Sequence, residues 1–444
     1  MKFINISLPA LLLVMIISCT KKEDSSEKYF SDPLLYCTTV KKLNNVVLEN
    51  NFPPMIGSRN YAYANIAAYE CIAAGNNQFI SLAGQLNQLP SMPKPAAGRK
   101  INFNLAALLA FTKLGNAVTF PEGSLMAYYD ELKHEADSVG MPAEVLKNTV
   151  EFSDSVVATV MRWSKKDNYA QTRTAERYFV QPDLEGRWIP TPPMYGSAVE
   201  PHWMEIRTLA IDSASQFMPV RPPVFDIKNK NSVYYKALME VKITGDSLTE
   251  EQKHIADFWD DNPFKMNVSG HVMFASKKFS PPGHWMNIVG IAAKKANADF
   301  GTTVAAYAQT AIALFDGFIS CWDEKFRSNY VRPETVINKY VSDSWRPYIQ
   351  TPPFPSYTSG HATVSAAAAE VMTGWFGDKL QFTDTSLLEF GIKNREITSF
   401  RDASIEAAMS RLYGGIHYRF DNDAGNKSGK RLGEFIVAKL KMRK

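Results

Sequence analysis

A lysine and an arginine stand seven residues apart in the segment 322–333, and both could bind an anion. Seven residues make about two turns of an α-helix. Lys325 and Arg332 would therefore project from one face if a helix continued past Lys325, and Pro333 would mark the end of that element. Two cations on one helical face are usually solvated, so this pair alone predicts no site.

A second segment, 352–361, ends in Ser359, Gly360 and His361, and an alanine-rich stretch follows it. A loop that meets a helix N-terminus in this way suits an anion, because free amides and the positive end of the helix dipole point outward. Ser359 could donate its hydroxyl proton, and Gly360 would let the backbone approach closely. His361 could act as an acid or a base near neutral pH. A capped helix with an exposed histidine is the simpler alternative.

A third segment, 410–421, contains Arg411, a Gly-Gly pair that should end a helix, His417 and Asp421. A carboxylate that meets an imidazole fixes its tautomer and raises the basicity of the far nitrogen. His417 would then serve as a nucleophile or as a metal ligand. The alternative is a helix C-terminus with a histidine and an aspartate on the surface.

The three segments together provide three cations, a hydroxyl, a main-chain amide and two histidines. A tetrahedral dianion needs such donors, because charge-assisted hydrogen bonds are strong and burying the anion without them is prohibitive. The set consists of Lys325, Arg332, Ser359, Gly360, His361, Arg411 and His417.

The order Lys-x6-Arg-Pro, Ser-Gly-His and Ser-Arg-x3-Gly-x-His-x3-Asp resembles the signature of the type-2 phosphatidic acid phosphatase superfamily. That superfamily includes bacterial acid phosphatases and vanadium-dependent haloperoxidases. Trp322 and Phe354 resemble the haloperoxidase branch, whose fungal chloroperoxidases carry a tryptophan and a phenylalanine there as the halide-lining wall. For either aromatic alone, core packing is the alternative. Thr358 departs from the proline that usually precedes Ser-Gly-His, without removing a ligand group.

The resemblance implies an all-α fold of helical bundles, similar to twin four-helix bundles, and vanadate as the cofactor. His417 would coordinate vanadium, while Lys325, Arg332, Arg411, Ser359 and Gly360 would bind the oxygens. His361 would transfer a proton, Lys325 would polarise the peroxide, and Asp421 would support His417. Hydrogen peroxide would oxidise a halide, most simply iodide or bromide, to hypohalous acid that attacks a small organic acceptor.

Two other functions fit the same residues. Phosphate would fit the vanadate site, so an acid or lipid phosphate phosphatase with His417 as its nucleophile is one alternative. A non-catalytic, ligand-binding outer-membrane lipoprotein is the other. It predicts that replacing His417 or His361 with alanine leaves ligand binding nearly intact.

His284 opens a helix after Pro-Pro-Gly, well before the three motifs. We interpret it as lining the cavity or lying just behind it; capping and packing are the alternatives. Asp260 and Asp261 could supply a carboxylate partner for Arg411, although turn acids on the surface are common.

Helical periodicity dominates the elements that must position these residues, and alternation typical of strands is scarce. Pro- and aromatic-rich loops, clearest at 182–201 and 217–225, should pack over the helices or roof a site. The predicted helices span 61–74, 105–116, 123–138, 143–164, 250–259, 284–298, 302–322, 361–376, 404–413 and 427–441.

The N-terminus predicts export. Lys2 precedes a short apolar run over 8–17, and Ser18-Cys19 resembles a bacterial lipoprotein cleavage box. We expect a signal peptide over 1–18, a lipidated tether over 19–30 with the anchor at Cys19, and one helical domain over 31–444 with its site from 322–421. The outer membrane is the expected location; an ordinary signal peptide with an incidental cysteine is the alternative.

The 444 residues, 45% of them hydrophobic, allow a large core, and the net charge of +4 with no basic run excludes nucleic acid as a partner. Beyond Cys19 three cysteines remain, so at most one disulfide forms, and no cysteine pair has the spacing of a metal site.

Overall fold

The computed structural model describes residues 24–121, 123–263, 266–269, 272–275 and 278–444. Fifteen α-helices and two small two-stranded sheets lie in these ranges, which confirms the all-α prediction. The predicted signal peptide and Cys19 lie outside the described residues. Cys37, Cys71 and Cys321 are free thiols.

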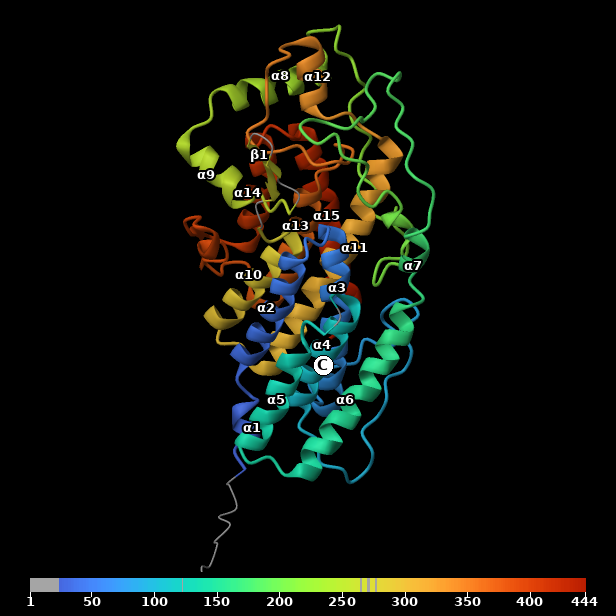
Figure 1. Cartoon of the computed structure of the whole chain (residues 1–444), viewed down its shortest axis with the longest axis vertical. Helices are drawn as coiled ribbons and strands as arrows, with labels where there is room; N and C mark the ends of the chain where they lie inside the picture. The colour runs from blue at the N-terminus through green and yellow to red at the C-terminus, as the bar shows by residue number, and fades with distance from the viewer. Residues whose placement is uncertain (1–23, 122, 264–265, 270–271, 276–277) are drawn as a thin grey trace, which may run out of the picture.

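The first part of the chain forms helices that pack in the lower half of Figure 1. These are α1 (Ser26–Tyr29), α2 (Pro33–Glu49), α3 (Pro54–Gly75), α4 (Phe103–Val118), α5 (Met126–Ser138) and α6 (Ala143–Ser164). The short α7 (Tyr169–Thr172) follows and contacts the 3-10 turn Trp203–Glu205.

The remaining elements fill most of the upper half. They are η1 (Trp203–Glu205), α8 (Val233–Asp246), α9 (Glu250–Phe258), β1 (Met266–Ser269), β2 (Val272–Ala275), α10 (Pro281–Lys295), α11 (Phe300–Ser328), α12 (Pro333–Tyr340), α13 (Gly360–Phe376), β3 (Phe382–Asp384), η2 (Leu388–Phe390), β4 (Arg395–Ile397), α14 (Phe400–Tyr413) and α15 (Arg419–Lys439). Both sheets, β1–β2 and β3–β4, are antiparallel pairs.

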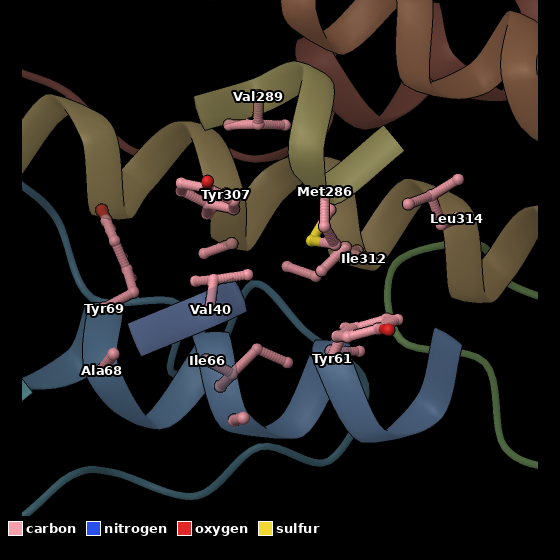
Figure 2. Close-up of a cluster of buried hydrophobic side chains, with 14 of the residues drawn as sticks. Val40, Tyr61, Ile66, Ala68, Tyr69, Met286, Val289, Tyr307, Ile312 and Leu314 are labelled. Carbon is pink, nitrogen blue, oxygen red and sulfur yellow. The ribbon is translucent and has the colours of Figure 1, made fainter. Parts of the chain in front are cut away.

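Helix α11 joins the two groups of helices. It packs on α3 of the first group and on α13 of the second, while α3, α4 and α6 contact one another, as do α13, α14 and α15. Figure 2 shows Ile312 of α11 and Ile66 of α3 in the space between these two helices. In the described part of the chain α11 is the one helix long and apolar enough to cross a membrane, but its apolar stretch is fully buried within the protein. It is therefore a core helix.

Two glycines of α15 allow it to pack very closely against α13. A Cβ at Gly429 would lie 2.0 Å from the carbonyl oxygen of Thr363, and one at Gly425 would lie 2.9 Å from that of Ser359. Any side chain at Gly429 would separate the helices. The close packing places the first turn of α13 beside the first turn of α15, which contains Asp421 and directly follows His417.

Several element boundaries differ from the prediction. Pro281 begins α10 instead of breaking the chain, because proline is tolerated in the first turn of a helix. Helix α15 begins at Arg419, eight residues before the predicted start, and α2, α8 and α12 were not predicted. The packed body also begins before residue 31, since Ser26–Tyr29 are helical and Phe30 is fully buried.

Candidate active site

Lys325 and Arg332 do not share a helical face, which corrects the sequence-based interpretation. Helix α11 ends at Ser328, and Asn329 adopts a left-handed conformation that turns the chain. Arg332 is the N-cap of α12, and Pro333 begins that helix instead of ending the previous one. Both cations are nevertheless fully buried and reach the same loop.

That loop, residues 354–356, holds both cations through its carbonyl groups. The ammonium of Lys325 donates to the carbonyl oxygens of Pro355 and Ser356 at 2.8 and 2.9 Å. Arg332 donates to Phe354 at 2.8 Å. Burial lowers the pKa of Lys325 to about 7 and that of Arg332 to about 9. Asp421 attracts both cations, but its charge does not offset their loss of water.

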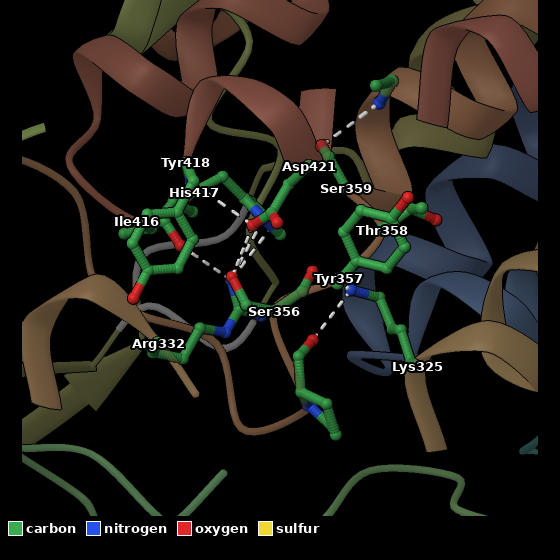
Figure 3. Close-up of polar contacts among 12 residues, drawn as sticks. Lys325, Arg332, Ser356, Tyr357, Thr358, Ser359, Ile416, His417, Tyr418 and Asp421 are labelled. Carbon is green, nitrogen blue, oxygen red and sulfur yellow. Dashed lines mark hydrogen bonds and ion pairs between the residues drawn. The ribbon is translucent and has the colours of Figure 1, made fainter. Parts of the chain in front are cut away.

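His417 and Asp421 form the pair that the sequence predicts, and Figure 3 shows them with Ser356. Nδ1 of His417 lies 2.8 Å from Oδ2 of Asp421, which also accepts a 2.5 Å hydrogen bond from Ser356. Nε2 of His417 lies 3.0 Å from a guanidinium nitrogen of Arg332, so Nε2 carries the lone pair. Burial and the charges of Arg332 and Lys325 lower the pKa of His417 well below its usual value. The ring is neutral, as a ligand must be.

The N-terminus of α13 has the predicted geometry. The hydroxyl of Ser359 caps the helix by accepting from the amide of Ala362 at 3.4 Å, so its own proton is free to be donated elsewhere. Gly360 leaves open space, because a Cβ there would meet only the ring of Trp322, at 3.8 Å. Gly360 and His361 line the same cavity as His417.

Arg411 and His361 meet at the main chain that follows α9. Arg411 donates to the carbonyl oxygens of Trp259 and Asp260, not to the carboxylate that the sequence suggested. Burial lowers the pKa of Arg411 to about 10, although the negative charges of Asp260 and Asp261 act to raise it. Burial, followed by the charge of Arg411, lowers the pKa of His361 well below its usual value, while a hydrogen bond to the main chain of Trp259 opposes the shift.

Aromatic and proline side chains form most of the remaining cavity wall. Trp322 and Phe354 both line it, with ring centroids 5.0 Å apart. The indole nitrogen of Trp322 donates to the carbonyl of Val199, so the predicted loop over 182–201 does pack beside the site. His284 does not line the cavity. It lies one layer behind the wall and forms a hydrogen bond with Asp261, which does line the cavity.

The donor set fits a tetrahedral oxyanion. Among the described residues no group of three or more His, Cys, Asp or Glu could hold a metal cation. Nη2 of Arg332 and Nε2 of His361 are buried without a hydrogen-bond partner in the described structure. Unpaired buried polar atoms and cations are costly unless a ligand completes their hydrogen bonds.

Sequence reasoning missed Ser356, Trp259 and Asp384. Ser356 lies inside the segment 352–361, but a serine among prolines does not by itself indicate a contact with His417 or Asp421. The carbonyl of Trp259 is 152 residues from Arg411 in the sequence, and the carboxylate of Asp384 is 100 residues from His284. Only the folded structure brings each pair together.

Comparison with known proteins gives a consistent family assignment. A family model described as the second helical-bundle domain of VCPO matches residues 305–443. The crystal structure of a bacterial vanadium-dependent iodoperoxidase superposes with a TM-score of 0.87 and 43% sequence identity, covering 93% of this chain and 97% of that one. Among curated protein sequences no significant match was found.

Two more distant structures share the fold. The holo and apo forms of a bacterial vanadium-dependent chloroperoxidase each have a TM-score of 0.65 and 18% identity and cover 87% of this chain; the matches span 92% and 94% of the two relatives. The identity and coverage of the iodoperoxidase match place this chain in a family: it belongs to the vanadium-dependent haloperoxidases. It is thus a peroxidase-type oxidoreductase, whose substrates are hydrogen peroxide and a halide.

Proposed function

We propose that the chain binds vanadate at His417 and oxidises iodide with hydrogen peroxide. The observation that carries this proposal is a neutral histidine beside three buried cations whose donors are not all used. Nε2 of His417 would ligate vanadium, while Lys325, Arg332 and Arg411 would bind the oxygens. Ser359 and the amide of Gly360 would add two neutral donors. Phosphate has the same shape and would compete for these groups.

The chain's own residues would then hold and move protons around the oxyanion. Bound vanadate would supply Lewis acidity that activates hydrogen peroxide toward the halide. His361 is neutral and its Nε2 is unpartnered, so it is suited to accept a proton from peroxide and release it later. Lys325 uses two of its three N–H donors on carbonyl groups, so the third would polarise a peroxide oxygen. Asp421 would keep the proton of His417 on Nδ1.

Iodide is the halide we propose, with bromide as the alternative. The relative that is 43% identical is described as an iodoperoxidase, and the walls here are largely apolar. A large, weakly hydrated anion loses little on leaving water for such walls. Hypoiodous acid would then react with a small organic acceptor.

A halide series at fixed peroxide tests this proposal. The protein is loaded with vanadate, and triiodide formation is compared with bromination and chlorination of a phenol. We expect vanadate-dependent oxidation of iodide, with bromide slower. Phosphate-ester hydrolysis is measured without vanadate, and His417→Ala serves as the inactive control. Hydrolysis without vanadate-dependent halide oxidation would identify a phosphatase instead.

We further propose that the protein is an outer-membrane lipoprotein anchored at Cys19. The supporting feature is the apolar run that ends in Ser18-Cys19, followed by a polar stretch before the first helix. Expression in a bacterial host with membrane fractionation tests this: the chain should partition with outer membranes, and Cys19→Ala should release it. A chain that stays soluble with Cys19 intact would contradict the anchor.

A further inference from the structure

Both ring nitrogens of His284 face carboxylates. Nδ1 lies 3.0 and 3.1 Å from the two oxygens of Asp261, and Nε2 lies 3.0 Å from Oδ2 of Asp384. All three side chains are buried. A neutral imidazole has one N–H and could satisfy only one of these acceptors, so the ring carries both protons and a positive charge. We call Asp261, His284 and Asp384 the histidine bridge.

The charges within the histidine bridge support one another. Burial opposes a charge on His284, but the attraction of Asp261 and Asp384 outweighs it and raises the pKa to about 10. Although burial alone would raise the pKa of Asp384, the charge of His284 lowers it. Such a buried cluster is costly to disrupt, because removing one member leaves the other charges buried without a partner.

The histidine bridge holds the chain segment 259–261, which follows α9. The indole of Trp259 stacks on the ring of His284, with centroids 4.7 Å apart and an interplanar angle of 25°. Asp261 has a φ of +41°, in the region that favours glycine. A non-glycine residue keeps this conformation only where its surroundings hold it. Here the two hydrogen bonds from His284 do so.

The same segment touches two groups of the active site. Trp259 and Asp260 accept hydrogen bonds from Arg411 through their carbonyl oxygens, and the ring of His361 is bonded to the main chain of Trp259. The bond to Trp259 occupies one nitrogen of His361 and leaves Nε2 unpartnered. A shift of this carbonyl would therefore move an oxyanion ligand and the proton-transfer group together.

We propose that His284 is a positioning residue for the reaction: by clamping Asp261 against Asp384 it fixes the Trp259 carbonyl, which orients Arg411 and His361. This inference rests on the proposed function, in which Arg411 binds the oxyanion and His361 transfers a proton. It predicts that loss of the bridge weakens oxyanion binding and slows turnover. The KM for peroxide should change less, since neither Trp259 nor His284 lines the cavity in which peroxide would react.

The variant His284→Gln removes the charge but keeps a planar donor for one carboxylate. Calorimetry with inorganic vanadate should show binding weakened about tenfold or more, the effect usual for partners of metal-site ligands. The kcat should fall in parallel while the circular dichroism is retained. The matched control is His202→Gln, which removes a histidine–carboxylate pair with Glu205, 2.8 Å apart, away from the cavity. The control should bind vanadate as the wild type does. A folded His284→Gln protein with wild-type vanadate affinity and kcat would overturn the proposal.

Asp384→Asn provides the second variant if His284→Gln fails to fold. It keeps an acceptor for Nε2–H and removes one charge, and it should also weaken vanadate binding; unchanged binding overturns the proposal. A third measurement needs no variant. Nitrogen-15 spectra of histidine-labelled wild type at pH 8.5 should show one ring protonated on both nitrogens, and the absence of such a ring overturns the proposal. A wild-type protein that binds vanadate but oxidises no halide would contradict the proposed function. The vanadate-binding and NMR measurements would still test the role of His284 in that case.

Discussion

His417 and Asp421 stand four residues apart at the start of α15, with Nδ1 of the imidazole 2.8 Å from a carboxylate oxygen. This contact gives the ring its tautomer and leaves Nε2 beside Arg332, 3.0 Å from the guanidinium. An acidic residue in the first turn also suits the positive end of the helix dipole. The reactivity of His417 therefore depends on where α15 begins.

Replacing Asp421 with asparagine should weaken vanadate binding. Asparagine keeps the shape but cannot fix the proton on Nδ1 by charge, and partners of this kind typically contribute 10- to 100-fold, of which we expect about the lower figure here. Calorimetric titration with vanadate measures the change. Asp423→Asn is the control, because Asp423 lies exposed on the same helix. Equal affinity in the two variants would argue against a role for Asp421.

Replacing Gly360 with alanine should weaken vanadate binding without lowering the stability of the fold. The added Cβ meets only Trp322, at an ordinary distance, so the fold should be retained or stabilised by about 0.4–1 kcal/mol. The methyl group would nevertheless stand where the amide must approach the oxyanion, and vanadate binding should weaken. Thermal unfolding and vanadate titration are measured together. Gly374→Ala in the same helix, where a Cβ meets Val437 at 3.5 Å, should change neither binding nor turnover.

Oxyanions should stabilise the protein against heat. Lys325, Arg332 and Arg411 are buried without a full set of anionic partners, so a ligand that neutralises them favours the folded state. At a concentration 100 times its Kd, vanadate or phosphate should add about 2.7 kcal/mol. Scanning calorimetry with and without each anion measures this, with planar nitrate at matched ionic strength as the control. An equal shift with nitrate would indicate a general salt effect.

Stability should depend on pH through His284. Its folded pKa is about 10, above the ordinary value of 6.5, because Asp261 and Asp384 hold the charged form. Folding therefore favours the protonated ring, and this contribution is complete below pH 6.5 and is lost as the pH rises through 10. Urea unfolding of the wild type and His284→Gln at pH 6, 8 and 10 should show a difference that narrows as the pH increases. A constant difference would mean that His284 is not charged in the folded protein.

Sequence patterns predicted the helices whose boundaries depend on local signals. The helix over 143–164 matches α6, because its apolar stripe and its flanking proline are local features. Helix α15 was predicted to begin eight residues late, since Gly425 weakens the local helical preference. That glycine is explained only by the approach of α13, with Ser359 on the other side. A contact between segments about 65 residues apart cannot be recognised from the local sequence of either segment.

The candidate site was predictable where charge and spacing are unusual. Lys325, Arg332, Arg411 and His417 are rare as buried residues, and their order along the chain carried the assignment. The route by which Arg332 reaches the site was not predictable, because the left-handed turn at Asn329 ends α11 about one turn after Lys325 and the chain continues to Arg332 outside that helix. The histidine bridge likewise joins three segments: the sequence drew attention to His284 and Asp261 separately, but it gave no sign of Asp384 or of the contacts between the three residues.

X-ray absorption at the vanadium edge, on protein loaded with vanadate, tests the central claim most directly. We predict one imidazole nitrogen in the first shell of vanadium, lost in His417→Ala together with iodide oxidation. Vanadium bound through oxygen alone in the wild type, or an unchanged spectrum in His417→Ala, would contradict the account.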